Sequence, residues 1–208
     1  TIPCFGQTFP EFNAMGTQSQ IQLYNEALLL VGANEISSVT EETNNATLCN
    51  RFFESARDYV TVNSRWNSVQ SEASLTASAT APIVNDKWLK KGELPNDPYC
   101  LRVLDAYVNG VNVDYEVVGR FLYSNDLPLD IRYVSRISDL SSISPGLFQA
   151  IALYLAYKIS YPVTRDLQSV KDIYSLYQDH IREARMIDAH EGVPITIESN
   201  SLTEDRVR

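Results

Sequence analysis

The first regular pattern in the chain is helical and covers residues 17–32. Thr17 and Gln20 have the spacing of a capping box, in which the two side chains close the first turn of a helix. Gly32 stands where a left-handed residue ends many helices. The pattern therefore predicts a helix that begins at Thr17 and ends before Gly32. Its apolar face, at helical spacing, consists of Ile21, Tyr24, Leu28 and Val31.

A second helix is predicted between Thr40 and about Ser64. Thr40 is a favourable N-cap residue, and the acidic Glu41 after it suits the positive end of a helix dipole. Residues 17–67 are therefore predicted to form a helical hairpin, preceded by an extended arm at residues 1–16. The expected apolar face of the second helix is Leu48, Phe52, Ala56, Tyr59 and Asn63.

Helical periodicity is lost at residue 68, and residues 68–140 are predicted to form a β-rich insertion. Ser, Thr, Ala, Pro and Asn are frequent in residues 68–98, and no regular element is assigned there. Residues 99–108 contain many β-forming side chains and end at Asn109-Gly110, which is a strong signal for a tight turn.

Two further strands follow the Asn109-Gly110 turn. Residues 113–123 begin with alternating apolar and acidic side chains, and Gly119 is predicted to bend this strand. A second turn is predicted at residues 125–128, and residues 129–133 alternate again. Such alternation is typical of strands with one buried face, so three strands are predicted to form an antiparallel meander.

The last part of the chain is again helical. Ser144 and Pro145 form the N-cap and first residue of a third helix, which Pro162 is expected to end. This helix is expected to be the most buried, because its apolar residues are Leu147, Phe148, Ile151, Leu155 and Ile159. A fourth helix is predicted from a cap at Asp166 to Gly192. Its face is Val170, Ile173, Tyr174, Tyr177, Ile181 and Ala184.

The order helix, helix, strands, helix, helix predicts an α+β protein. The two helical hairpins, at residues 17–67 and 141–192, are expected to form a four-helix bundle that carries a small antiparallel β-meander as an insertion. Residues 193–208 alternate only briefly and have no predicted partner in their own chain, so they are expected to form a C-terminal arm.

Composition and charge narrow the functional classes. The chain has 208 residues, of which 44% are hydrophobic and 21% charged, values that are typical of a globular protein. Its formal net charge is −9, and it contains no block of Lys and Arg, which disfavours tight binding to nucleic acid. The longest apolar stretch, at residues 151–159, contains Lys158 and is too short to span a bilayer, so no membrane association is expected.

Candidate catalytic and metal-binding groups are few. His180 and Glu183 lie three residues apart on the fourth helix, but His190 lies too far along it to share their metal ion, so no metal site is predicted. Cys49 and Cys100 have no predicted base nearby and are expected to be buried small hydrophobes. No nucleotide-binding loop or nucleophile elbow occurs, so no cofactor and no catalytic residue are predicted.

Tyrosine is unusually frequent, with twelve copies. Tyrosine combines a large contact area with few rotatable bonds, and it is enriched at protein interfaces. A lateral interface between subunits is one interpretation of the cluster on the last two helices, and ordinary packing at the border of a core is the other. The clustered residues are Tyr154, Tyr157, Tyr161, Tyr174 and Tyr177.

Several segments of the chain together resemble one known family. The most characteristic are LYNEALLLVG at residues 23–32, YEVVGRFLY at residues 115–123 and AIALYLAYKI at residues 150–159. Shorter pieces of the same resemblance lie at residues 36–38, 48–51, 65–67, 100–104, 131–134, 161–164 and 183–192. In this order and spacing they resemble the tail tubular protein A, or head-to-tail adaptor, family of short-tailed (podovirus) bacteriophages. Residues 1–16 and 73–98 depart from the family pattern.

The resemblance implies a structural virion protein rather than an enzyme. Members of the family form a dodecameric ring that joins the portal protein to the tail nozzle, tubular protein B, and surrounds the channel through which DNA leaves the head. Tail fibres dock near the junction of adaptor and nozzle. An acidic subunit suits a channel that DNA passes without specific binding.

If the chain is such an adaptor, two of its segments have expected roles. The C-terminal arm is expected to contact the portal or a neighbouring subunit through Val193, Pro194, Ile195, Ile197 and Leu202. The β-meander is expected to face the nozzle or the fibres, with candidate residues Tyr115, Tyr123, Asn109 and Asn125.

Two other functions remain open from the residues alone. A tail-associated hydrolase of cell-wall carbohydrate would need a concave pair of carboxylates, and its candidates are Asp114, Glu116, Asp126 and Asp130. A monomeric assembly-binding module would bind virion proteins without becoming part of the particle.

Overall fold

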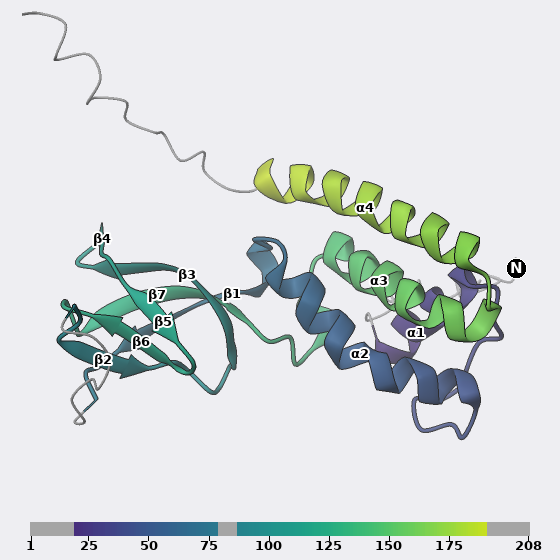
Figure 1. Ribbon diagram of the computed structural model, residues 1–208, viewed down its shortest axis with the longest axis horizontal. Helices are drawn as coiled ribbons and strands as arrows, with labels where there is room; N and C mark the ends of the chain where they lie inside the picture. The colour runs from purple at the N-terminus through teal and green to yellow at the C-terminus, as the bar shows by residue number, and fades with distance from the viewer. Residues whose placement is uncertain (1–18, 79–86, 191–208) are drawn as a thin grey trace, which may run out of the picture. The chain divides into compact units, whose positions relative to one another are not determined.

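The computed structural model describes residues 19–78 and 87–190, and it shows a mixed α+β protein with helices and two small antiparallel sheets (Figure 1). The helices are α1 (Gln20–Leu30), α2 (Asn44–Val62), α3 (Pro145–Thr164) and α4 (Leu167–His190). The strands are β1 (Gln70–Leu75), β2 (Lys90–Glu93), β3 (Cys100–Val108), β4 (Val111–Asn112), β5 (Glu116–Val118), β6 (Phe121–Ser124) and β7 (Leu129–Ser135).

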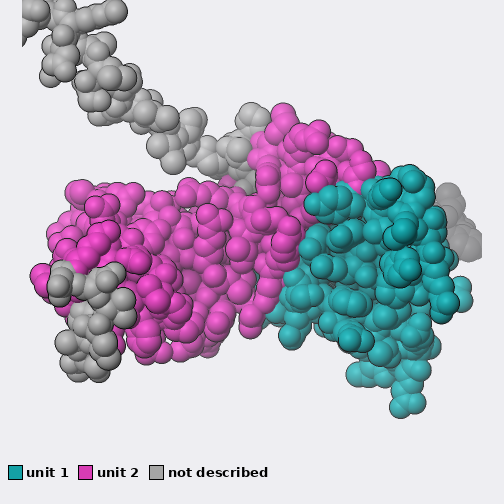
Figure 2. Space-filling view, viewed as in Figure 1, with its two compact units in different colours: residues 1–57, 137–174 teal, residues 58–136, 175–208 magenta. Residues whose placement is uncertain are grey.

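The chain divides into two compact units (Figure 2). Unit 1 comprises residues 1–57 and 137–174, and it contains α1, α3 and parts of α2 and α4. Unit 2 comprises residues 58–136 and 175–208, and it contains all the strands of the described ranges.

Helix α1 begins two residues later than the capping-box pattern predicts. Ser19, not Thr17, is the N-cap, because its side chain accepts a hydrogen bond from the Gln22 amide. The prediction that this helix ends before a left-handed Gly32 is confirmed, since Gly32 follows the helix with a φ of +72°. Tyr24 and Leu28 of the predicted face are fully buried, and α1 packs against α3 in unit 1.

Helix α2 also begins later than predicted. The predicted cap at Thr40 is wrong: the Thr40 amide donates to Ser38 Oγ in a turn. Thr43 performs the capping role, because its Oγ1 accepts from the Ala46 amide at 3.3 Å. Glu41 accepts from the Ser37 amide and hydroxyl, which accounts for the turn before the helix.

The buried face of α2 differs from the predicted one. Of the predicted residues only Ala56 is buried, whereas Tyr59 is 44% exposed. The buried positions keep a helical period but are offset from the predicted stripe, and they are Ala46, Cys49, Phe53, Ala56 and Val60.

Helix α3 is the long apolar helix that the sequence predicts. The Ser144 side chain accepts from the Leu147 amide, and all five predicted apolar residues are buried. The prediction that Pro162 ends the helix is wrong, since the helix continues to Thr164 and closes with Arg165 in the left-handed region at a φ of +55°. Only the final turn contains the proline, so only one backbone hydrogen bond is lost.

Helix α4 begins as predicted. The Asp166 carboxylate accepts hydrogen bonds from the amides of Gln168 and Ser169 and from the Ser169 hydroxyl. Ile173, Tyr177, Ile181 and Ala184 of the predicted face are buried. The predicted C-terminal Gly192 lies outside the described residues. A search of the helices in the described ranges found none long and apolar enough to cross a bilayer.

The first sheet of unit 2 has the strand order β1-β7-β3-β4, with all neighbours antiparallel. Strand β7 lies at its centre, with Gln70 opposite Val134 on one side and Val103 opposite Tyr133 on the other. Asn109 and Gly110, with φ values of +51° and +80°, form the predicted two-residue turn between β3 and β4.

The second sheet has the strand order β2-β6-β5 and corrects the predicted meander. Gly119 does not bend one continuous strand. It has a φ of +63° in the hairpin turn that joins β5 to β6, where Val118 pairs with Phe121. The chain therefore folds back at Gly119, and β3 pairs directly with β7 rather than with the strand that the sequence predicts as its neighbour.

Strands β1 and β2 lie in the segment to which no element is assigned from the sequence. Strand β1 alternates between exposed positions at Glu72 and Ser74 and half-buried or buried positions at Ala73 and Leu75. Strand β2 contains Gly92, where an added Cβ would lie 3.2 Å from the Thr76 carbonyl oxygen. A larger residue there would require the neighbouring segment to shift by a few tenths of an ångström.

The two sheets of unit 2 share one apolar core. Its residues come from β1, β3, β6 and β7 and from the connections around them: Leu75, Leu94, Cys100, Ala106, Leu122, Leu127, Leu129, Ile131 and Tyr133. Because both sheets contribute to the same buried cluster, each requires the other for its burial.

Candidate functional site

The predicted tyrosine cluster is partly assembled in unit 1. The ring centroids of Tyr157 and Tyr174 lie 4.9 Å apart, and those of Tyr154 and Tyr157 lie 5.6 Å apart. The Lys158 ammonium lies 5.2 Å from the centre of the Tyr154 ring, within the range of a cation–π interaction. Residues from α3 and α4 therefore form one continuous aromatic group.

Burial separates the five tyrosines into two kinds. Tyr154 and Tyr177 are 6% and 4% exposed, so they belong to the packing of the molecule. Tyr161 and Tyr174 are 54% and 36% exposed, and Tyr157 is intermediate. The exposed members lie at the surface, whereas truncation of the buried members would act on stability.

The four candidate residues in the β region also differ in their surroundings. Tyr115 donates a hydrogen bond to the Leu104 carbonyl oxygen, and burial raises the pKa of its hydroxyl. Tyr123 is buried, so both tyrosines contribute mainly to packing. Asn109 and Asn125 are exposed; Asn125 accepts from the Leu89 amide, and Asn109 occupies the turn between β3 and β4.

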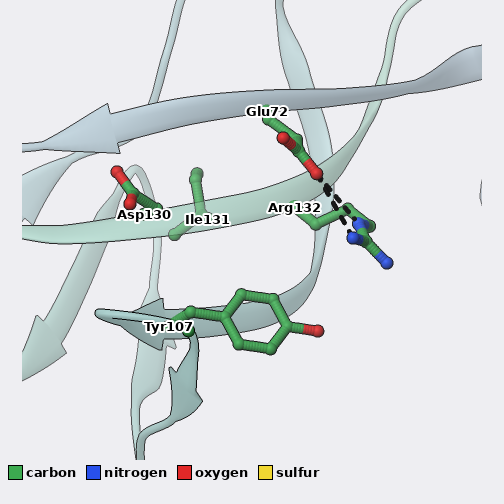
Figure 3. Close-up of a pocket in the computed structure, with 6 residues that line it drawn as sticks. Glu72, Tyr107, Asp130, Ile131 and Arg132 are labelled. Carbon is green, nitrogen blue, oxygen red and sulfur yellow. Dashed lines mark hydrogen bonds and ion pairs between the residues drawn. The ribbon is translucent and has the colours of Figure 1, made fainter.

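A hollow of about 380 Å³ lies on the first sheet of unit 2 (Figure 3). Its lining residues come from β1, β3, β7 and the turn after β3: Glu72, Tyr107, Gly110, Asp130, Ile131 and Arg132. Strand pairing sets this arrangement, because Glu72 lies opposite Arg132 and Tyr107 opposite Asp130. Side chains of paired residues emerge on the same face of a sheet.

Polar contacts hold the lining side chains in place. Arg132 Nε and Nη2 both donate to Glu72 Oε1, at 3.3 and 3.2 Å, as the dashed lines in Figure 3 show. Ser74 donates a hydrogen bond to Asp130. The Arg132 guanidinium lies 5.9 Å from the centre of the Tyr107 ring. The hollow thus presents an aromatic ring, two carboxylates and one guanidinium.

Of the four carboxylates considered for a hydrolase, only Asp130 lines this hollow. Glu116 belongs to the second sheet, where it accepts a hydrogen bond from the Trp88 indole. Sequence reasoning missed Glu72, Tyr107 and Arg132 as a group because β1 was not recognised. The alternation of polar and less polar residues from Gln70 to Leu75 was the available signal.

The two described cysteines are buried, as predicted. Burial raises the pKa of the Cys49 thiol to about 11. Burial likewise raises the pKa of the Cys100 thiol to about 11, against the smaller opposing effect of the Arg120 charge. The nucleophilic form of cysteine is the thiolate, so neither thiol is activated for catalysis near neutral pH.

No group of three or more His, Cys, Asp and Glu residues in the described ranges is placed to hold a metal ion. His180 and Glu183 lie on α4, and the side chain of His190 lies outside the described part, as do Val193, Pro194, Ile195, Ile197 and Leu202 of the C-terminal arm.

Comparison with known proteins adds no relative to these observations. No protein-family model matches the sequence, and no curated protein matches it significantly.

Proposed function

We propose that this chain is a subunit of the head-to-tail adaptor ring of a short-tailed bacteriophage. The observation that carries the proposal is the order of the sequence segments that resemble the family. LYNEALLLVG falls on α1 and its C-cap, YEVVGRFLY falls on the β5–β6 hairpin, and AIALYLAYKI falls on α3. Three separate segments thus coincide with three separate elements in the order that the family would have.

The element order supports the same proposal. Two helices precede the strands and two follow them, as expected for a helical bundle that carries a β insertion. In the assembled subunit we propose that the four helices form this bundle. Lateral contacts would use the exposed tyrosines of α3 and α4, and the β region of unit 2 would face the nozzle or a tail fibre.

The charge of the chain suits a DNA channel. With 26 acidic and 17 basic residues, the subunit repels the phosphate backbone on average. Twelve such subunits around an exit channel would let DNA pass without specific binding. The portal protein, the nozzle and neighbouring copies of the chain are the partners in this proposal, and the location is the tail of the virion.

The first experiment is mass photometry of the purified chain, alone and mixed with its portal protein. The expected result is a discrete complex that contains about twelve copies of the chain, the cyclic assembly that heterologous interfaces produce when they close. A chain that stays monomeric and does not bind the portal would overturn the proposal and favour a monomeric assembly-binding module.

A deletion tests the role of the C-terminal arm. Removal of residues 193–208 is expected to abolish head–tail joining in an in vitro assembly assay. The melting temperature should change little, because this arm has no partner predicted within its own chain. Normal joining by the truncated chain would contradict the proposed role of the arm. Truncation after residue 202 is a matched control that retains all five predicted contact residues.

A further inference from the structure

The hollow on the first sheet of unit 2 offers hydrogen-bonding groups that the described residues do not use. Glu72 Oε1 accepts both bonds from Arg132, which leaves Glu72 Oε2 without a partner within the described ranges. In the same ranges the Tyr107 hydroxyl and Arg132 Nη1 also have no hydrogen-bond partner, and Asp130 has one, Ser74. Donors and acceptors therefore lie next to one another around the hollow.

The arrangement of these groups is held by the sheet before any ligand arrives. Arg132 is fixed by its two bonds to Glu72, and the Tyr107 ring lies beside its guanidinium (Figure 3). Tyr107 and Arg132 are both half-buried, and Glu72 is exposed. A ligand would find donors, acceptors and an aromatic ring already in position, which lowers the entropic cost of binding.

We propose that this hollow binds a neutral saccharide. Vicinal hydroxyl groups of a sugar both donate and accept hydrogen bonds, which matches the mixture of carboxylate oxygen, guanidinium and phenol groups around the hollow. The apolar C–H face of a pyranose would lie against the Tyr107 ring. A volume of about 380 Å³ falls at the lower end of the range for small-molecule sites, and it suits one or two sugar rings.

The charge of the lining residues selects among ligand classes. Glu72 and Asp130 outnumber Arg132, so a phosphate or an acidic sugar would meet net repulsion. A basic peptide would meet carboxylates that already accept hydrogen bonds, Glu72 from Arg132 and Asp130 from Ser74. A lysine would have to compete with Arg132 for Glu72, whereas a hydroxyl group can use the remaining oxygen without breaking the ion pair.

Binding without hydrolysis is the expected activity. A glycosidase requires one carboxyl group that stays protonated to act as an acid. Here Glu72 is paired with Arg132 at 3.2 Å, and its Oε1 acts as a hydrogen-bond acceptor. The inference concerns unit 2 alone and does not depend on ring formation, so it goes beyond the proposed function and can fail independently of it.

The test is saturation-transfer NMR on the full-length chain with methyl glucoside, methyl galactoside, N-acetylglucosamine and the disaccharide cellobiose as probes. Probe concentrations up to about 20 mM cover the millimolar dissociation constants expected for a shallow site. The expected result is a transfer signal for at least one probe, together with a shift of the Gly110 amide resonance, because Gly110 lines the hollow.

Variants identify the site. Tyr107→Ala should abolish the transfer signal, and Glu72→Gln, at an exposed position where folding is not at risk, should weaken the apparent affinity at least about fivefold. Tyr59→Ala, at an exposed tyrosine on α2, is the matched control and should retain the signal. No signal with any probe, or a signal unchanged in Glu72→Gln, would overturn the proposal. So would a shift of Gly110 caused by the tripeptide Lys-Gly-Lys but by none of the sugars.

Discussion

At the scale of single residues, Arg120 holds several backbone carbonyls of unit 2 at once. Its Nη1 donates to the Cys100 carbonyl oxygen at 2.8 Å, and its Nη2 donates to the Leu94 carbonyl oxygen at 3.1 Å. The guanidinium also lies 4.2 Å from the centre of the Tyr99 ring. A planar group with several donors can make these contacts together, whereas an ammonium cannot.

Arg120→Ala is expected to lower the free energy of unfolding of unit 2 by about 2–4 kcal/mol, because carbonyl groups beside the core lose charged donors. Arg120→Lys should recover less than half of that loss. Urea unfolding followed by near-UV circular dichroism measures both effects.

The control for Arg120 is Arg182→Ala. Arg182 forms an exposed ion pair with Asp179 at 3.4 Å, and loss of such a pair should cost no more than about 0.5 kcal/mol. Equal effects of Arg120→Ala and Arg182→Ala would show that the carbonyl contacts of Arg120 contribute little.

The cap of α4 gives a prediction of pH dependence. Hydrogen bonds from the Ser169 hydroxyl and from the Gln168 and Ser169 amides lower the pKa of the Asp166 carboxyl in the folded protein. The ionised carboxylate therefore stabilises the fold. This contribution is complete above the unfolded pKa, near 4, and is lost as the pH falls through the lower folded pKa.

Asp166→Asn keeps a side-chain oxygen that can cap the helix but removes the charge. At pH 7 its melting temperature should be below that of the wild type and above that of Asp166→Ala. The difference between wild type and Asp166→Asn should shrink as the pH falls below about 4, because the wild-type carboxyl then becomes neutral. A difference that is constant from pH 7 to pH 3 would contradict this account.

At the scale of elements, helix caps and tight turns could be predicted from the sequence, whereas the pairing of strands could not. Gly32, Ser144, Asp166 and the Asn109-Gly110 turn were identified correctly because a few neighbouring residues determine each of them. Strand pairing depends on contacts between distant segments. The pairing of β3 with β7, and of β2 with β6, has no local signature in the sequence.

The face of α2 was missed for a different reason. Two adjacent stripes of this helix carry apolar residues, and the predicted stripe has large side chains at Phe52 and Tyr59. The buried stripe contains small residues such as Ala46 and Cys49, and only the packed neighbours reveal that it is the inner one. Among the residues that line the hollow in unit 2, Asp130 is the one that the sequence suggests as a candidate for chemistry. The grouping of Glu72 with Arg132 depends on the pairing of β1 with β7, which the sequence does not predict.

The neighbouring residues Phe52 and Phe53 test the observed face of α2. Phe53 is 7% exposed, and its ring packs edge-on against Tyr24 with centroids 5.4 Å apart. Phe53→Ala is expected to cost about 3–5 kcal/mol of unfolding free energy because it leaves a cavity. Phe52→Ala, at a half-buried position, should cost less than half as much. Thermal or urea unfolding measures the loss of stability in both variants. A larger loss for Phe52→Ala than for Phe53→Ala would show that the predicted face is the buried one.

At the scale of the whole molecule, assembly would use side chains that the fold leaves exposed. Tyr161 is more than half exposed on α3, whereas Tyr154, about two helical turns earlier, is buried. In the proposed ring, an exposed residue such as Tyr161 would affect association, and a buried residue such as Tyr154 would affect folding.

Tyr161→Ala is therefore expected to weaken self-association or portal-dependent ring formation at least about tenfold, the effect of losing a tyrosine from the centre of an interface. Its melting temperature as a monomer should stay close to that of the wild type. Mass photometry across a dilution series measures the association. Tyr59→Ala, on α2, is the matched control, and unchanged assembly in both Tyr161→Ala and Tyr174→Ala would exclude this surface as the lateral interface.

Strands β6 and β7 lie inside their sheets, and this limits where a shortened recombinant fragment of the chain can begin. A recombinant fragment that begins at Cys100 would omit β1 and β2, and both central strands would then become outer strands with unpaired amides and carbonyls. Unpaired edges recruit strands from other molecules, so this fragment should precipitate or form fibrils. A soluble version of the β region needs to start before Gln70, even though no strand is predicted from the sequence between Gln70 and Glu93.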